Sequence, residues 1–122
     1  MKALGIDMGT SSIKVSLLDI ESGACVDSST NPKTEMPIET LRDGWAEQDP
    51  EMWWRYIGEG IRDIASRHPM SEVRAIGITY QMHGLVCLDR EGRPLRKSII
   101  WCDSRAVAIG DEARDALGRD RC

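Results

Sequence analysis

The stretch "GIDMGTSSIKVSLLD", residues 5–19, decides the fold because it contains two strand-like runs joined by a tight turn. Apolar and β-branched residues dominate both runs, and the small polar residues at positions 9–12 are typical of a β-hairpin. Asp7 comes just before the turn, and Lys14 lies in the second run. Small side chains, hydroxyls and free backbone N–H groups are also what a phosphate-binding loop needs. Two interpretations are therefore open: a solvated hairpin turn and a phosphate site.

Length and charge limit the kind of protein that this sequence can form. A chain of 122 residues fits one domain, but it is short for an enzyme that must enclose two substrates. Its 16 Lys and Arg residues against 20 Asp and Glu residues give a net charge of −4, and charges of one sign do not cluster. We therefore expect no nucleic-acid partner.

Cysteine spacing and hydropathy point to an ordinary intracellular protein. No CxxC or Cys/His pattern is present, so we expect reduced thiols and no zinc site at Cys25, Cys87, Cys102 and Cys122. No apolar run approaches the length of a membrane span or of a signal-peptide core. These features predict a cytoplasmic protein with no membrane partner.

Beyond the hairpin, residues 24–31 predict a third strand, and a helix follows it. Asp49 is a good N-cap, and Pro50 suits the first helical position. Apolar residues then recur three or four positions apart, which predicts one buried helix face made of Trp53, Ile57, Ile61 and Ile64. Pro69 ends the helix.

The second half of the chain predicts three more strands and a second helix. Residues 73–80 have the continuous apolar character of a fully buried strand, and residues 84–89 and 98–101 predict shorter strands. Asp103 is suited to cap a helix with an apolar face made of Ala106, Ile109, Ala113 and Ala116. The resulting order βββαβββα predicts a mixed sheet covered by helices, in an α/β or α+β domain.

Four motifs in this sequence resemble those of a known family. "GIDMGTSSIKVSLLD" is similar to the first phosphate motif of the actin, heat-shock-chaperone and sugar-kinase superfamily, whose lobes have a ribonuclease H-like fold. Three later motifs resemble FGGY carbohydrate kinases, above all the xylulokinases: "GWAEQDPEMWW" at residues 44–54, "IGITYQMHG" at 76–84 and "IIWCDSRA" at 99–106. The resemblance implies an α/β lobe of the ribonuclease H-like, actin-like ATPase type.

The same resemblance implies roles for particular residues. It assigns ATP phosphate binding to Gly9, Thr10, Ser11, Ser12 and Lys14, and it makes Asp7 the residue that positions Mg²⁺. It assigns sugar binding to Gln81, Met82, His83, Trp101, Asp103 and Arg105.

Four of the sugar-binding assignments have structural alternatives that the residues alone leave open. His83 is also typical of a structural hydrogen-bond donor, and Trp101 of a core residue. Asp103 is also suited to a helix N-cap, and Arg105 to a side chain of the first helical turn.

The resemblance also implies the reaction, phosphoryl transfer from Mg·ATP to a ketose hydroxyl. It places the catalytic Asp and the adenosine-binding segment later in a longer chain, so we expect residues 1–122 to be the N-terminal part of the first lobe and inactive alone. Thr79, Tyr80 and Cys102 depart from the family pattern near the sugar, so xylulose, ribulose, fuculose, gluconate and glycerol stay open. A chaperone-like or actin-like ATPase and a non-catalytic sugar-binding module are the rival functions, and the oligomeric state, including a homodimer, is open.

Overall fold

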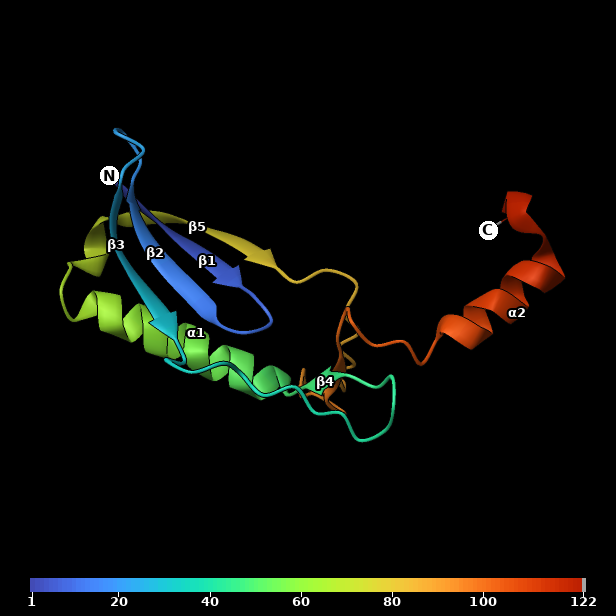
Figure 1. Cartoon of the computed structure of the whole chain (residues 1–122). Helices are drawn as coiled ribbons and strands as arrows, with labels where there is room; N and C mark the ends of the chain where they lie inside the picture. Colours follow the sequence, from blue (N-terminus) through green and yellow to red (C-terminus); the bar gives the residue numbers. More distant parts are fainter. Residues whose placement is uncertain (122) are drawn as a thin grey trace.

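The computed structural model describes residues 1–121 and contains a mixed sheet with one long helix packed on it (Figure 1). Its strands are β1 Lys2–Met8, β2 Ile13–Asp19, β3 Cys25–Asn31, β4 Glu47–Gln48, β5 Val73–Tyr80 and β6 Ser98–Ile99. Its helices are α1 Pro50–Ala65 and α2 Val107–Leu117, with single 3₁₀ turns η1 Met70–Glu72 and η2 Arg119–Arg121.

The main sheet has the order β3-β2-β1-β5. β1 and β2 form the predicted antiparallel hairpin, in which Asp7 lies opposite Lys14, and β3 extends it as predicted. β5 pairs with β1 in parallel, from Lys2↔Val73 to Met8↔Tyr80. A parallel pair places both carboxyl ends at the same edge of the sheet, so the turn after β1 and the segment after β5 are neighbours.

The core lies between one face of this sheet and α1. Alternate residues of β1 and β2 point toward the helix and are buried, and the helix contributes Trp53 and Ile64. α1 approaches β2 so closely that a Cβ on Gly60 would lie 2.6 Å from Val15 Cγ2. Gly60 therefore allows the close packing, beyond its effect on helix propensity.

The predicted start of α1 is confirmed, but the helix ends earlier than predicted. The Asp49 side chain accepts a hydrogen bond from the backbone N–H of Glu51 at 3.0 Å, and Pro50 opens the helix. The helix ends at Ala65, with Ser66 as its C-cap, a few residues before Pro69. Local capping chemistry was therefore sufficient to locate the start of α1, whereas Pro69 gave only an outer limit for its end.

β5 is the main departure from the expected burial. The sequence predicted a fully buried strand, but Ile76, Ile78 and Tyr80 are 59%, 63% and 62% exposed. These side chains share the sheet face that α1 covers, yet the helix lies over β2 and β3 and leaves β5 uncovered. Within residues 1–121, β5 is also an edge strand with no partner on its outer side.

The segment after β5 also differs from the prediction. Residues 84–89 form no strand, only isolated bridges from Leu85 to Ile99 and from Leu88 to Pro94. The strand predicted at residues 98–101 shortens to β6, which pairs with the unpredicted two-residue β4 in a small second sheet. A tight turn at residues 89–93 reverses the chain, and across it Asp89 donates to the Arg93 carbonyl and Leu95 to the Cys87 carbonyl, so the pairing around this turn is short.

The second helix begins later than predicted. α2 starts at Val107 after Ala106, and no side-chain cap is present, so the prediction of Asp103 as the N-cap was wrong. The Asp103 carboxylate is engaged elsewhere, as described below. α2 has no buried residue and stands away from the sheet (Figure 1), so the expectation that it would help to cover the sheet was also wrong for this part of the chain.

Candidate functional site

The carboxyl edge of the β1–β5 pair brings the predicted phosphate turn and the predicted sugar segment together. Gln81, the first residue after β5, donates its backbone N–H to the Met8 carbonyl at the end of β1, at 3.0 Å. The crevice outside the carboxyl ends of parallel strands is where open α/β sheets bind their ligands. The strand arrangement therefore gives these two motifs a common site.

The turn at residues 9–12 is tightly built. The Gly9 N–H donates to the Ser12 carbonyl at 3.1 Å, and a Cβ on Gly9 would lie only 3.0 Å from that oxygen. The Ser11 carbonyl accepts a hydrogen bond from the backbone N–H of Met36 at 2.8 Å. The Gly9 amide is thus engaged inside the turn, so an incoming anion would meet the other amides and the hydroxyls. Ser11 and Lys14 are exposed.

Asp7 is exposed at the end of β1, with Lys14 opposite it on β2 and Thr79 beside it on β5. Within residues 1–121, no group of three or more His, Cys, Asp or Glu side chains is placed to hold a metal. A single carboxylate beside a phosphate site still suits Mg²⁺, which commonly takes one or two protein carboxylates and completes its shell with waters and phosphate oxygens. Asp7 fits that role.

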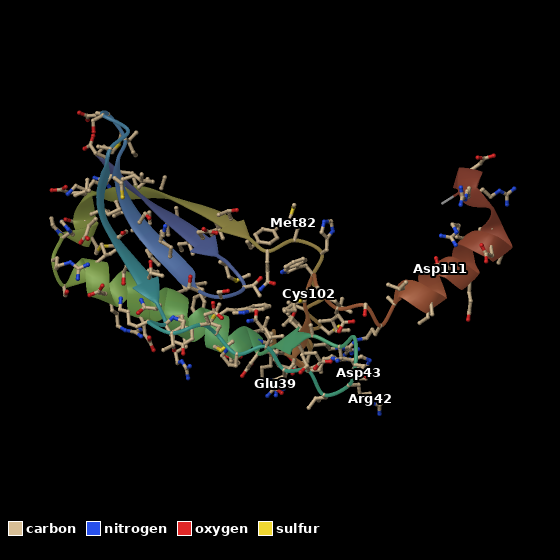
Figure 2. All side chains as sticks on the ribbon, viewed as in Figure 1. Glu39, Arg42, Asp43, Met82, Cys102 and Asp111 are labelled. Carbon is tan, nitrogen blue, oxygen red and sulfur yellow. The ribbon has the colours of Figure 1, made fainter. Side chains whose placement is uncertain are left out.

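The predicted sugar segment lines an open pocket of about 310 Å³, bounded by Gln81, Met82, His83 and Trp101. Met82 is 66% exposed and Trp101 58% exposed, so the alternative of Trp101 as a core residue is excluded. Figure 2 shows Met82 just beyond the end of β5, with Cys102 nearby in the segment that leads toward α2. A sugar presents a carbon–hydrogen face and hydroxyl groups. The pocket offers apolar side chains, Met82 and Trp101, for the first and polar side chains, Gln81 and His83, for the second.

His83 has a positive φ of 64°, which is uncommon outside glycine, although Asn, Asp and His adopt it several-fold more often than other side chains. Strained backbone of this kind is concentrated at functional sites and needs support from its surroundings. Here the support comes from the Leu85 N–H, which donates to the Ile99 carbonyl at 2.8 Å. The His83 side chain is exposed and lines the pocket, so it is accessible to a ligand there.

The two halves of the site touch directly through Thr10. The Trp101 indole Nε1–H donates to Thr10 Oγ1 at 3.0 Å, and the Thr10 hydroxyl donates to Gln81 Oε1 at 3.2 Å. One side chain of the phosphate turn therefore contacts two side chains of the pocket. Sequence motifs alone gave no indication of this contact.

Asp103 and Arg105 hold the segment that carries Trp101. The Asp103 side chain is 3% exposed and accepts hydrogen bonds from the Ala46 N–H at 2.6 Å and from the Arg105 N–H at 2.9 Å. The Arg105 guanidinium pairs with Asp103 and with Glu47 and lies 3.8 Å from the centre of the Trp45 ring. Arg105 lowers the pKa of Asp103, and Asp103 raises that of Arg105.

These contacts satisfy both charged groups within the protein. Neither Asp103 nor Arg105 lines the pocket of Trp101 and His83. Further bonds between Ser104 and Gly44 join the same two segments. The motif at residues 99–106 is thus fastened to residues 44–48, and its charged side chains position Trp101.

Two buried polar residues of β4 were not singled out from the sequence. Glu47 is 5% exposed and pairs with Arg96 and Arg105, and Gln48 is 1% exposed. A two-residue strand shows no alternation, so periodicity could not reveal it. The available signal was the position of these polar residues inside a family-like motif, directly before the cap of α1.

Comparisons with known proteins identify the family of this chain. Residues 2–121 match the model of the FGGY family of carbohydrate kinases, N-terminal domain. The chain is 41% identical over 104 residues to the xylulose kinase of Escherichia coli, which covers 85% of this chain and 21% of that protein. It is 34% identical to a solved "xyloylose kinase" from Brucella ovis, with a TM-score of 0.86 over 96% of this chain and 24% of the other. A gluconate kinase structure from Lactobacillus acidophilus has a TM-score of 0.83 and 30% identity over 94% of this chain and 22% of its own.

The family match extends over nearly all of the described chain, and the solved sugar kinases share its fold. The chain spans between a fifth and a quarter of the length of these relatives. Among residues 1–121, no helix is both long and apolar enough to cross a membrane.

The family match and the solved sugar kinases identify the α/β fold as the ribonuclease H-like, actin-like ATPase fold of these kinases. The chain belongs to the FGGY family of carbohydrate kinases, to whose N-terminal domain it corresponds.

Proposed function

We propose that the protein to which these residues belong is an ATP-dependent sugar kinase that transfers the γ-phosphoryl group of Mg·ATP to a hydroxyl of a ketose. The observation that carries the proposal is the contact between the phosphate turn and the sugar pocket, in which the Trp101 indole donates to the Thr10 hydroxyl at 3.0 Å. Phosphoryl transfer depends on positioning and charge stabilisation. A site that fixes both substrates against each other supplies the first of these.

The phosphate half of the site has one acidic group and several neutral or basic ones. Asp7 would hold Mg²⁺ or one of its waters, and the groups that would hold phosphate oxygens are those of Thr10, Ser11, Ser12 and Lys14, in a turn that Gly9 shapes. When bound, Mg²⁺ supplies positive charge that offsets the charge on the phosphates. Lys14 is exposed directly across from Asp7, so its ammonium group can reach an anion bound beside the turn.

The sugar half presents apolar and polar groups together. Met82 and Trp101 would receive the carbon–hydrogen face of the sugar, and Gln81 and His83 would satisfy its hydroxyls, since an unpaired buried polar group costs about 1–3 kcal/mol. Asp103 and Arg105 would act on the sugar indirectly, because their polar atoms are already paired within the protein.

The proposal extends to the whole protein. Residues 1–122 would be the N-terminal part of a first kinase lobe in a cytoplasmic enzyme, and the catalytic Asp and the adenosine site would come from other parts of the chain. Xylulose is the first candidate substrate because two of the similar proteins bear that name or a variant of it. The structural likeness to a gluconate kinase keeps other sugars in the test.

Calorimetry on the complete protein tests this proposal. Pentuloses, hexuloses, gluconate and glycerol are titrated with and without Mg·ATP, and product is assayed in the same samples. We expect one sugar class to bind and to be phosphorylated. Sugar binding without product would indicate a non-catalytic sugar-binding module. ATP hydrolysis at a rate that does not depend on sugar would indicate a chaperone-like or actin-like ATPase.

The Asp7→Asn variant tests the metal role within that assay. Loss of the carboxylate should lower kcat at saturating Mg·ATP and leave sugar binding by calorimetry little changed, since Asp7 is not part of the sugar pocket. An unchanged kcat would remove Asp7 from the metal site and leave the kinase assignment standing.

A further inference from the structure

We propose that Gln48 is a positioning residue that fixes the phosphate turn against the sugar pocket. This inference rests on the proposed kinase function and adds to it a residue that touches neither substrate. Gln48 lies on the short strand β4, directly before the N-cap of α1, and its side chain is fully enclosed at 1% exposure.

Every polar atom of the Gln48 side chain is used. Its Nε2 donates to the Thr10 carbonyl at 2.8 Å and to the Pro37 carbonyl at 3.3 Å. Its Oε1 accepts from Gln81 Nε2 at 3.1 Å and from Trp53 Nε1 at 3.2 Å. A primary amide has two N–H donors and a carbonyl acceptor with two lone pairs, so these four contacts saturate it.

Three of these residues form a closed ring of hydrogen bonds. The Thr10 hydroxyl donates to Gln81 Oε1, Gln81 Nε2 donates to Gln48 Oε1, and Gln48 Nε2 donates back to the Thr10 carbonyl. Thr10 belongs to the phosphate turn and Gln81 to the sugar pocket. The ring therefore joins one residue from each half of the site through a residue that belongs to neither.

The ring is anchored to the core by Trp53. This residue lies on the first turn of α1, is 6% exposed, and donates its indole N–H to Gln48. The Thr10 hydroxyl also accepts from the Trp101 indole at 3.0 Å, so the ring reaches the wall of the pocket as well. Buried polar networks of this kind specify one arrangement when every member is satisfied.

Such an anchor would matter to the reaction more than to the binding of either substrate. Each substrate contacts only its own half of the site, and the backbone hydrogen bonds within each half remain when the ring is broken. A misplacement of about 1 Å between reacting groups can cost roughly 100-fold in rate. Loss of Gln48 should therefore lower kcat while the KM for sugar and the KM for Mg·ATP change little.

The test uses Gln48→Met in the complete protein, because Met has a similar length and no comparable hydrogen-bonding groups. We expect kcat to fall at least tenfold, with each KM within about threefold of the parent. Gln48→Glu keeps the acceptor for Gln81 and Trp53 but loses the donor to Thr10, and it should lose kcat to a similar extent.

A matched control separates positioning from general loss of stability. Ile64 is 0% exposed on α1 and is not a member of the ring, so Ile64→Val weakens the core without touching the site. We expect Ile64→Val to lower the melting temperature and to retain the parent kcat. The double variant of Gln48→Met with Thr10→Val should lose little more activity than the more impaired single variant, because both break the same ring.

The possible failures are distinguishable. If the parent shows no sugar-dependent phosphorylation, the proposed function fails and the inference fails with it. If the parent is active and Gln48→Met keeps kcat within twofold, the positioning role alone is overturned. The role is also overturned if Ile64→Val loses kcat as severely, or if Gln48→Met raises only one KM and leaves kcat unchanged.

Discussion

At the scale of single residues, the site depends on side chains whose neighbours restrict them. His83 has a positive φ of 64° and is exposed beside Met82 and Trp101. Asp103, by contrast, is nearly enclosed and is paired to Arg105 and the backbone of Ala46. Both residues were predicted to bind the sugar, but only His83 has an exposed side chain that lines the pocket.

A prediction for His83 follows from that exposure. The His83→Ala variant should raise the KM for the sugar about fivefold, which corresponds to the loss of one hydrogen bond of about 1 kcal/mol. The KM for Mg·ATP should stay near the parent value, because His83 does not contact the turn. Steady-state kinetics on the complete protein checks both numbers, and a selective loss of ATP affinity would show that His83 belongs to the nucleotide half.

A second prediction concerns Asp27, which joins β3 to the segment after α1. Its carboxylate accepts hydrogen bonds from Arg67 Nε at 2.8 Å and from the Ser28 N–H at 2.8 Å, and it lies 2.9 Å from His68 Nε2. Arg67 makes the largest contribution to lowering the pKa of Asp27 from 3.8 to about 2. Because the folded pKa lies below the unfolded one, Asp27 stabilises the fold above pH 3.8, and this contribution is lost as the pH falls toward 2.

The Asp27→Asn variant measures that contribution. The parent should be the more stable protein near neutral pH, and the difference in free energy of unfolding should shrink as the pH falls through the range of 3.8 to about 2. Urea unfolding of both proteins at several pH values checks this. A difference that stays constant across the range would mean that the ion pairs of Asp27 do not stabilise the fold.

Residue chemistry in the sequence predicted only part of the site. The motifs identified His83, Met82 and Trp101, and the structure places them around one pocket with Gln81. Gln48 and Glu47 were missed because their importance comes from partners far along the chain, such as Thr10 and Arg105. Contacts of this kind depend on the tertiary fold and leave no periodic pattern.

At the scale of elements, local signals located the long strands and α1 well. The Asp49 cap and the hairpin turn depend on contacts between residues only a few positions apart. The local sequence is therefore enough to predict where these elements begin or turn. The segment at residues 84–89 was misjudged because apolar character alone does not make a strand without continuous pairing, and its pairing is limited to isolated bridges at Leu85 and Leu88. The burial of β5 was misjudged for a similar reason, since burial depends on what lies beside a strand.

The packing of α1 on β2 gives a paired prediction at this scale. Gly60→Ala should destabilise the protein by about 1 kcal/mol or more, because overpacking against Val15 costs about 1–3 kcal/mol and exceeds the gain in helix propensity. Gly58→Ala should stabilise it by about 0.5–1 kcal/mol, since a Cβ there meets only the flexible end of Arg62. Thermal or urea unfolding of both variants checks the signs, and a stabilising Gly60→Ala would contradict the close approach of the helix and the sheet.

At the scale of the whole molecule, the family motifs predicted the fold class better than the local patterns did. The mixed sheet places the ends of β1 and β5 together, and the motifs at 44–54 and 99–106 converge on that edge through Gln48 and Trp101. The uncovered side chains of Ile76 and Ile78 on β5 and the unpacked α2 show where the fold is open within residues 1–121. Neither feature could be predicted from the apolar pattern, because such a pattern indicates that a side chain is suited to burial but not which element covers it.

The dependence of ATP turnover on sugar tests most directly whether one site joins phosphate and sugar at the carboxyl edge of β1 and β5. ADP formation by the complete protein is followed with Mg·ATP alone and then with added xylulose, and the sugar phosphate is identified as the product. A kinase of the proposed kind should form ADP only slowly until the ketose is present, and then form one sugar phosphate for each ADP. ADP formation at the same rate with and without any sugar, with no sugar phosphate, would contradict it.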